Sequence, residues 1–149
     1  MSAGDEATPA EVLRTYLEEV GAKGRIELID DLAHDDMVDE ANQMFGGPPG
    51  KAGLVAHVVG FRKNVTDLEV TIERVVGDTT TAIGWWRFEG THSGPWLGLP
   101  ATNERIRGTV ISRFDVDGGK VSRYRLFLWT DLDGGRTLDT SIAGGSEAS

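Results

Sequence analysis

The stretch ERIRGTVISRFDV, residues 104–116, decides the fold because its residue types alternate with a period of two. Its even positions, from Ile106 to Phe114, are mostly apolar or small, whereas three of its odd positions are arginines. Successive side chains of a β-strand point to opposite faces. The even positions are therefore predicted to face a core and the odd positions the outside.

The segments around this stretch repeat the alternation and predict consecutive antiparallel strands. Short turns at residues 77–78 and 117–119 contain glycine and have the character of hairpin connections. In residues 79–92 the even positions form the inward set, so Trp85 faces outward beside Ile83. An outward tryptophan predicts that this face is covered, most simply by a second copy of the protein. The predicted strands span residues 67–76, 79–92, 104–116 and 120–131.

The last predicted strand has two half-apolar faces. Its odd positions include Arg125, Phe127, Trp129 and Asp131, and its even positions run from Tyr124 to Leu128. If the odd set faces inward, a cation, an indole and a carboxylate lie in an apolar cavity. Unpaired charges there would be costly, so such residues would be paired or used in chemistry.

Helix signals precede the strands. Residues 8–11, TPAE, have the spacing of a capping box with proline at the first helical position, and predict a helix to about Val20. A second short helix near residue 29, a short strand at residues 37–44 and a proline–glycine turn at residues 46–50 follow. A third helix is predicted from the apolar stripe Leu54, Val58, Phe61 and Val65. Helices first and strands afterwards predict an α+β domain with its helices on one face of the sheet.

The composition is that of one globular domain. The chain has 149 residues, of which 39% are hydrophobic and 26% charged. We expect a domain over residues 1–133 and a flexible tail over residues 134–149, which is rich in glycine and serine. No apolar run is long enough to cross a membrane, and the acidic N-terminus lacks the pattern of a secretory signal. We therefore expect a cytoplasmic protein without membrane contact.

Several classes of cofactor and partner are disfavoured. The chain has no cysteine, and its three histidines are far apart in the sequence without metal-ligand spacing. A net charge of −9 repels nucleic acid. The glycine-rich turn at residues 46–50 lacks the lysine and the strand-to-helix setting of a phosphate-binding loop. We expect no metal, no nucleotide and no other cofactor.

The chain resembles the SnoaL-like polyketide cyclases, or ester cyclases, of the nuclear transport factor two-like superfamily. The resemblance rests mainly on GTHSGPWLGLPAT at residues 90–102 and FDVDGGKV at residues 114–121, with DDMVD at 35–39 and DLEV at 67–70. It implies a cone-shaped fold with a curved mixed or antiparallel sheet, N-terminal helices on the concave face and a pocket between them. It also implies a homodimer. Members of this architecture cyclise polyketides, hydroxylate anthracycline-type aromatics, isomerise steroids, open epoxides or only bind.

The sequence departs from the family at the residues expected to carry chemistry. The family's usual histidine after the first aspartates falls on Glu40, its Glu-His-Trp triplet falls on residues 123–125 (RYR), and its following aspartate falls on Trp129. The arginine and two aspartates of the related epoxide hydrolases fall on Val110, Ser112 and Trp129. The resemblance therefore indicates the fold more strongly than the reaction.

Two carboxylates are candidate acid–base groups. Asp131 lies two residues beyond Trp129, where aromatic walls would raise the pKa of a carboxyl group, unless it only caps the strand end in solvent. Glu40 replaces the family histidine and is expected to point the same way as Val38, unless it is a surface acid. Arg125, with Tyr124, is a candidate for holding a substrate oxygen, or Arg125 pairs with Asp131 or Glu40 as a structural bridge.

Two histidines and a group of aromatic residues complete the candidates. His92 is interpreted as catalytic or as an anchor of its loop, and His57 as a core histidine or as part of the roof of the pocket. Aromatic walls would favour a flat polycyclic ligand. The predicted substrate-binding residues besides His57 are Trp86, Phe88, Trp96, Ser112, Tyr124, Phe127 and Trp129.

These observations lead to three hypotheses. The first is a cofactor-independent enzyme of polyketide-type natural-product metabolism that acts by acid–base chemistry on a cyclic or aromatic ketone, as in an aldol cyclisation. The second is an accessory hydroxylase of aromatic polyketides. The third is a non-catalytic protein that binds a hydrophobic small molecule.

Overall fold

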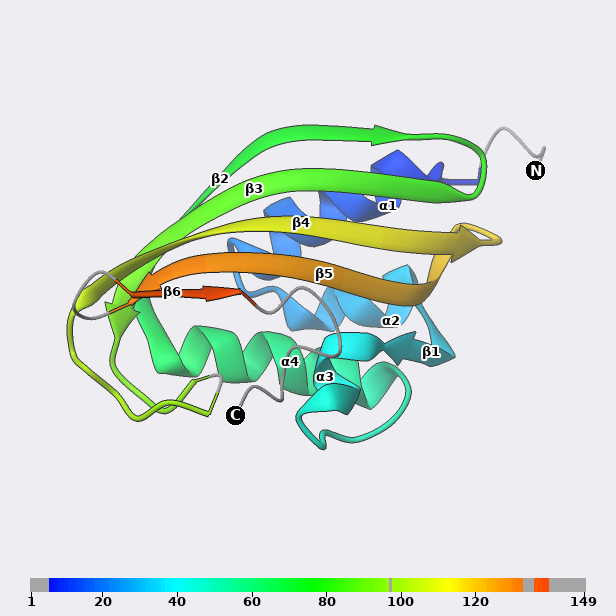
Figure 1. Cartoon of the computed structure of the whole chain (residues 1–149). Helices are drawn as coiled ribbons and strands as arrows, with labels where there is room; N and C mark the ends of the chain where they lie inside the picture. Colours follow the sequence, from blue (N-terminus) through cyan, green and yellow to red (C-terminus); the bar gives the residue numbers. More distant parts are fainter. Residues whose placement is uncertain (1–5, 97, 133–135, 140–149) are drawn as a thin grey trace.

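Four long antiparallel strands form the main wall of the protein (Figure 1). The computed structural model describes residues 6–96, 98–132 and 136–139. Within them the strand order is β1-β5-β4-β3-β2, with β1 parallel to β5 and β6 paired to β5. The four long strands match the segments predicted from the alternation. The strands are β1 (Ala33–Asp39), β2 (Val65–Gly77), β3 (Thr81–His92), β4 (Arg105–Asp117), β5 (Lys120–Leu132) and β6 (Arg136–Asp139).

The helices lie on one side of this open sheet, whose long strands bend around them (Figure 1). The first begins at the predicted capping box, where the Thr8 side chain accepts from the Glu11 backbone N–H and the Glu11 carboxylate accepts from that of Thr8. From Tyr16 it continues as a π-helix. This arrangement confirms the predicted α+β class with helices on the concave face. The helices are α1 (Pro9–Thr15), η2 (Tyr16–Gly21), η3 (Ile26–Leu28), α2 (Ile29–Leu32), α3 (Glu40–Met44) and α4 (Lys51–Asn64).

The first strand differs from the prediction. A strand was expected at residues 37–44, whereas β1 ends at Asp39 and α3 begins at Glu40. The physical reason is a helix cap, because the Asp39 side chain accepts a hydrogen bond of 3.1 Å from the backbone N–H of Asn42. Met37 and Asp39 are consequently the buried residues at this end of the strand, and Val38 and Glu40 do not share a strand face.

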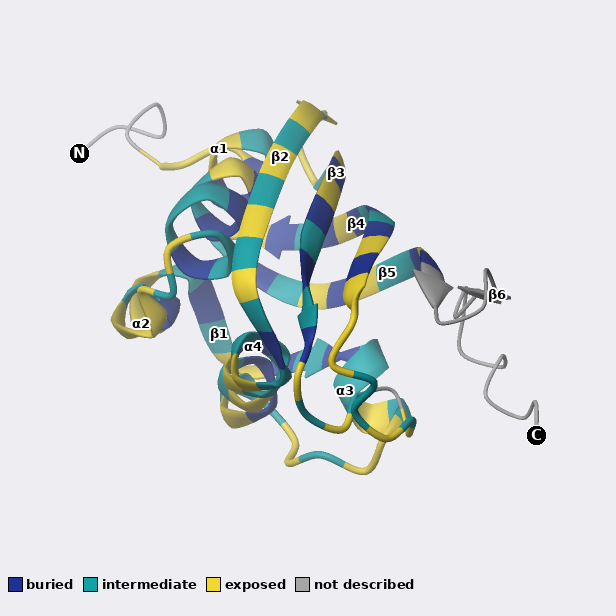
Figure 2. Cartoon of the chain, turned by 90° about the vertical axis from the view of Figure 1, so that its left-hand side faces the viewer, coloured by how far each residue is buried: buried dark blue, intermediate teal, exposed yellow. Residues whose placement is uncertain are grey.

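The alternation in the sheet follows the predicted parity (Figure 2). The even positions of β3 and β4 are buried, and helix α1 packs directly on Gly84 of β3. A Cβ atom at Gly84 would lie 3.0 Å from the Cδ1 atom of Leu17 and 3.1 Å from the Cδ2 atom of Leu13. The absence of a side chain at Gly84 therefore lets the helix approach the sheet closely.

Strand β5, whose two faces the sequence left undecided, faces the core with its even positions, so the alternative in which its odd set points inward is wrong. Pairing with β4 fixes this choice, because Val110 lies opposite Leu128 and Ile111 opposite Phe127, and opposed residues share a face. Leu128 is 4% exposed, whereas Trp129 is 39% exposed on the outer face.

The C-terminal segment adds one strand that the sequence pattern did not predict. Within the expected tail, Arg136–Asp139 form β6, antiparallel to β5, while residues 134–135 and 140–149 lie outside the described part of the chain. No helix in the described part is long and apolar enough to cross a membrane.

Candidate active site

A cavity of about 480 Å³ lies between the inner face of the sheet and the helices η2, α3 and α4. Cavities of this size commonly accommodate small organic ligands. Its wall is mainly apolar and its polar residues come from a few positions. The larger apolar side chains in the wall are Leu17, Met44, Phe45, Val58, Phe61, Val70, Trp86, Trp96, Val110, Leu126 and Leu128.

Aromatic rings build one end of this cavity. Phe61 of α4 lies 6.4 Å from Trp86 and 5.5 Å from Trp96 between ring centroids, and all three residues line the cavity. Phe88 packs edge-on against Phe61 at 5.0 Å but is buried behind them, outside the lining. The structure therefore brings Trp86 and Trp96 to the cavity, as expected, and uses Phe88 as core.

A histidine–aspartate pair forms the polar centre of the wall. His57 of α4 lines the cavity, and its Nδ1 atom lies 2.6 Å from Oδ2 of Asp39 at the end of β1. The Asp39 side chain is 1% exposed, and its Oδ1 atom caps α3 through the Asn42 N–H. An imidazole that donates its Nδ1 proton to this carboxylate and is neutral carries its lone pair on Nε2. Among the described residues no protein group bonds this Nε2 atom.

A network of buried hydrogen bonds holds Tyr124, whose ring packs against His57. The Tyr124 ring stacks on the imidazole with centroids 5.8 Å apart, and the Tyr124 hydroxyl lies 2.9 Å from Ser112 Oγ. Trp86 Nε1 donates to the same Ser112 oxygen at 3.0 Å. Ser112 is fully buried and does not line the cavity, so it positions Trp86 and Tyr124 rather than contacting a ligand.

Two phenols in the cavity wall are held in their neutral form. Burial is the main cause that raises the pKa of Tyr16 well above its ordinary value, and the nearby Tyr124 hydroxyl and Asp39 carboxylate add to it. Burial likewise raises the pKa of Tyr124. Both residues line the cavity, and their hydroxyl groups keep their protons across the ordinary pH range, so each remains a hydrogen-bond donor.

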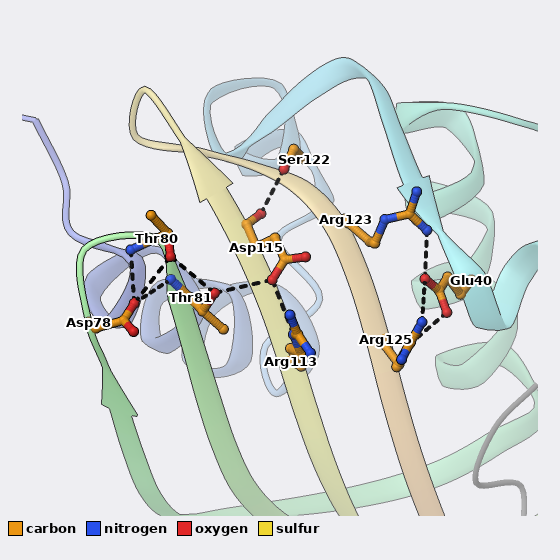
Figure 3. Close-up of polar contacts among 9 residues, drawn as sticks. All are labelled: Glu40, Asp78, Thr80, Thr81, Arg113, Asp115, Ser122, Arg123 and Arg125. Carbon is orange, nitrogen blue, oxygen red and sulfur yellow. Dashed lines mark hydrogen bonds and ion pairs between the residues drawn. The ribbon is translucent and has the colours of Figure 1, made fainter.

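Glu40 lies at the edge of the cavity in an ion pair. Its carboxylate accepts from Arg123 Nη1 at 2.6 Å and from Arg125 Nε at 2.8 Å (Figure 3). The hydrogen bond from Arg125 is the main cause that lowers the pKa of Glu40. A carboxylate held ionised in this way is a weak base, so the structure disfavours Glu40 as the proton acceptor and shows the Glu40–Arg125 bridge that the sequence left open.

Three of the remaining predicted site residues, His92, Phe127 and Trp129, lie away from the cavity. His92 is buried, its Nδ1 atom lies 3.2 Å from Thr102 Oγ1, and it does not line the cavity. Phe127 and Trp129 lie on the opposite face of the sheet, because the register of β5 turns its odd positions outward. The side chain of Asp131 lies outside the described part of the chain.

Asp39 and Tyr16 are the residues that the sequence analysis missed. Tyr16 lies within the first predicted helix, where the sequence analysis assigned it no role in the site. Asp39 stands two positions after Met37, so correct strand parity would have placed it inward, and Asn42 three positions later is a helix-cap spacing. Within the described residues no cluster of three or more metal-ligating side chains is present.

Comparison with known proteins identifies the family. The model of the SnoaL-like polyketide cyclases matches residues 10–128, and the chain belongs to this family. No curated protein matches the sequence.

Solved structures share the fold at low sequence identity. TsrD from Streptomyces laurentii is 22% identical, with a TM-score of 0.67 over 78% of this chain and 84% of that one. A SnoaL-like polyketide cyclase from Agrobacterium tumefaciens is 20% identical, with a TM-score of 0.66 over 86% and 93%. An LEH-like epoxide hydrolase from M. tuberculosis is 19% identical, with a TM-score of 0.58 over 79% and 76%. The family supports a polyketide-type enzyme without specifying its reaction, and the solved structures show the shared fold.

Proposed function

We propose that the protein is a cofactor-independent enzyme that removes a proton from the carbon next to a carbonyl group in a polyketide-type cyclic or aromatic ketone, as in an aldol cyclisation. One observation carries the proposal: His57 lies in the wall of an apolar cavity, and its Nδ1 atom is 2.6 Å from the buried Asp39 carboxylate. A histidine oriented by a buried carboxylate is a common arrangement for general acid–base catalysis.

In the proposed reaction His57 Nε2 accepts the proton of the substrate C–H bond. The electron pair of that bond forms an enolate, and a phenol O–H of Tyr16 or Tyr124 donates to the enolate oxygen. The enolate carbon then forms a bond to a second carbonyl carbon of the same molecule. The new alkoxide takes the proton back from the imidazolium, so no external acid or base is consumed.

The apolar wall contributes by excluding water and by holding the ring system. Trp86, Trp96 and Phe61 offer aromatic surfaces on which a flat substrate can pack. Asp39 has a positioning role, because it holds the imidazole in one tautomer and faces it once it becomes charged. Asp39 also caps α3, so the same side chain orients the base and shapes the mouth of the cavity.

Proton exchange on a model ketone tests this proposal. In D2O, we expect the wild-type protein to accelerate exchange of the α-protons of 2-tetralone, followed by NMR. His57→Gln is expected to reduce the acceleration by roughly 10²–10⁴-fold, the usual contribution of a general base. Asp39→Asn should reduce it less while leaving the fold intact, because asparagine is an equally good helix cap.

The matched control is His34→Gln. His34 Nε2 bonds the backbone oxygen of Asp117 at 2.7 Å, and His34 does not line the cavity. This variant should exchange like the wild type. Equal exchange in the wild type and His57→Gln, with both proteins folded by circular dichroism, would contradict the proposed base. Binding of 2-tetralone without any acceleration would favour a non-catalytic binding protein instead.

A further inference from the structure

The mouth of the cavity can be located from the exposure of its lining residues. Most of the wall is buried or half-buried, but Phe45, Ala56, Pro95, Gly98 and Arg125 are themselves exposed. These residues mark where the cavity meets solvent. Arg125, whose guanidinium group bonds Glu40, therefore lies where a ligand would enter.

The charges at this mouth do not balance. Glu40 is bonded to Arg123 Nη1 at 2.6 Å, to Arg125 Nε at 2.8 Å and to Arg125 Nη2 at 3.2 Å (Figure 3). One carboxylate thus faces two guanidinium groups, which leaves one positive charge. The neighbouring Arg113 forms an ion pair with Asp115 at 3.1 Å, so these two residues add no net charge. The surplus stands out in a chain whose net charge is −9.

The arginine pair also has unused hydrogen-bonding capacity. A guanidinium offers five N–H donors in a planar fork that fits a carboxylate. Glu40 uses only Nε and Nη2 of Arg125 and Nη1 of Arg123, and about half of each arginine side chain is exposed. Among the described residues the other nitrogens of these two groups have no acceptor. These nitrogens can therefore receive an anion, and of the two arginines Arg125 is the one that lines the cavity.

We propose that Arg125, assisted by Arg123, binds a carboxylate group of the substrate, so that the substrate is an acidic cyclic or aromatic ketone. That the substrate is a ketone that reacts near His57 rests on the proposed function, whereas the anion site at Arg125 does not. The acid would lie at the mouth, the rings against Trp86 and Trp96, and the reacting carbon near His57. Holding one end of the molecule in this way fixes which carbon faces the base.

A purely structural role is the alternative, in which the pair only ties β5 to α3. One arginine would suffice for such a tie, and its replacement would affect acidic and neutral ligands alike. An anion site instead predicts that the effect depends on the charge of the ligand. It also predicts that Glu40 competes with the ligand for the two arginines.

A matched pair of probes separates these roles. We expect wild-type protein, titrated by calorimetry, to bind 2-naphthoate at least about 10-fold more tightly than 2-naphthamide, its neutral isostere. Arg125→Gln should remove most of this preference and leave the affinity for the amide within about twofold, and Arg123→Gln should have a smaller effect in the same direction. Arg113→Gln, a surface arginine outside the cavity lining, is the control and should keep the preference.

Glu40→Gln provides the opposite test. Removing the competing carboxylate should tighten 2-naphthoate binding several-fold, whereas a structural tie predicts weaker binding of both probes. Equal wild-type affinities for the two probes, or an equal loss of both in Arg125→Gln, would overturn the anion site. His57→Gln should retain the preference for 2-naphthoate, so failure of the anion site and failure of the proposed base can be told apart.

Discussion

The two faces of the strands β3, β4 and β5 differ in what their side chains can do. The inner face carries buried residues such as Phe114 and Trp86 and closes one side of the cavity. The outer face carries surface ion pairs, among them Arg113 with Asp115 and Arg105 with Glu89. The comparison teaches that one step along the middle of a strand separates a residue able to contact a substrate from one on the outer face. Arg125 is an exception, because it has an odd position on β5 and still lies at the mouth of the cavity.

The outer face nevertheless retains apolar surface. Trp85 is 44% exposed and Trp129 is 39% exposed, with Ile111 and Phe127 half-buried on the same face. Unpaired indoles on a sheet face commonly mark a contact surface. That a second copy of the protein covers them stays a prediction, and the mass of the protein in solution tests it.

The largest expected difference between the faces is in stability. Phe114→Ala removes a fully buried ring that packs 5.1 Å from both Tyr16 and Tyr124, and should cost about 3–5 kcal/mol of unfolding free energy. Phe127→Ala, on the outer face of the next strand, should cost less than half as much. Urea denaturation of the two variants measures this. Equal losses would mean that the outer face is buried as deeply as the inner one in solution.

Much of this division could be predicted from the sequence, but unevenly. In β4 the arginines mark one face clearly, so Ile106, Val110 and Phe114 were placed correctly. In β5 both sets contain apolar residues, and only the pairing register with β4, which no local pattern contains, decides between them. The sequence analysis offered the Glu40–Arg125 pair only as one of several possible pairings. The sequence placed both residues near the site but did not fix their partners.

The Asp39–His57 pair, the proposed catalytic pair, could not be predicted, for a different physical reason. Asp39 and His57 come from different elements, a strand end and the middle of a helix, and meet only in the folded chain. A single cap hydrogen bond from Asn42 to Asp39 ends β1. The predicted strand instead continued past Asp39 to residue 44. Val38 and Glu40 were therefore expected on the pocket side, and Asp39 was not considered as a site residue.

A smaller effect is expected from the network of buried hydrogen bonds at Ser112. Ser112→Ala leaves Trp86 Nε1–H without its acceptor and removes the partner of the Tyr124 hydroxyl, which should cost about 1–3 kcal/mol. The control is Ser122→Ala, whose hydroxyl donates to the backbone oxygen of Asp115 in a partly buried position and should cost less. The same denaturation series compares them. If both serines cost the same, the inner network contributes no more than an ordinary side-chain hydrogen bond.

The smallest expected effect is a loss of folding stability at alkaline pH. It arises from Tyr16 and Tyr124, which pack at the inner face of the sheet. Folding raises the pKa of Tyr16 and Tyr124 above their ordinary value of 10.0, mainly through burial, so the unfolded chain loses these protons first. The resulting stability is complete below about pH 10 and declines as the pH rises toward the folded pKa, by at most about 1.4 kcal/mol per pH unit for each phenol.

Urea denaturation between pH 8.5 and pH 11 measures this decline, and the chain makes the test clean because it contains only two tyrosines. A Tyr16→Phe, Tyr124→Phe double variant should lose stability with pH less steeply than the wild type, whatever the lysines contribute to both. Parallel curves would show that the two phenols reach water in the folded protein. They would then be poorer candidates for holding an enolate oxygen, since a donor exposed to water binds that oxygen in competition with solvent.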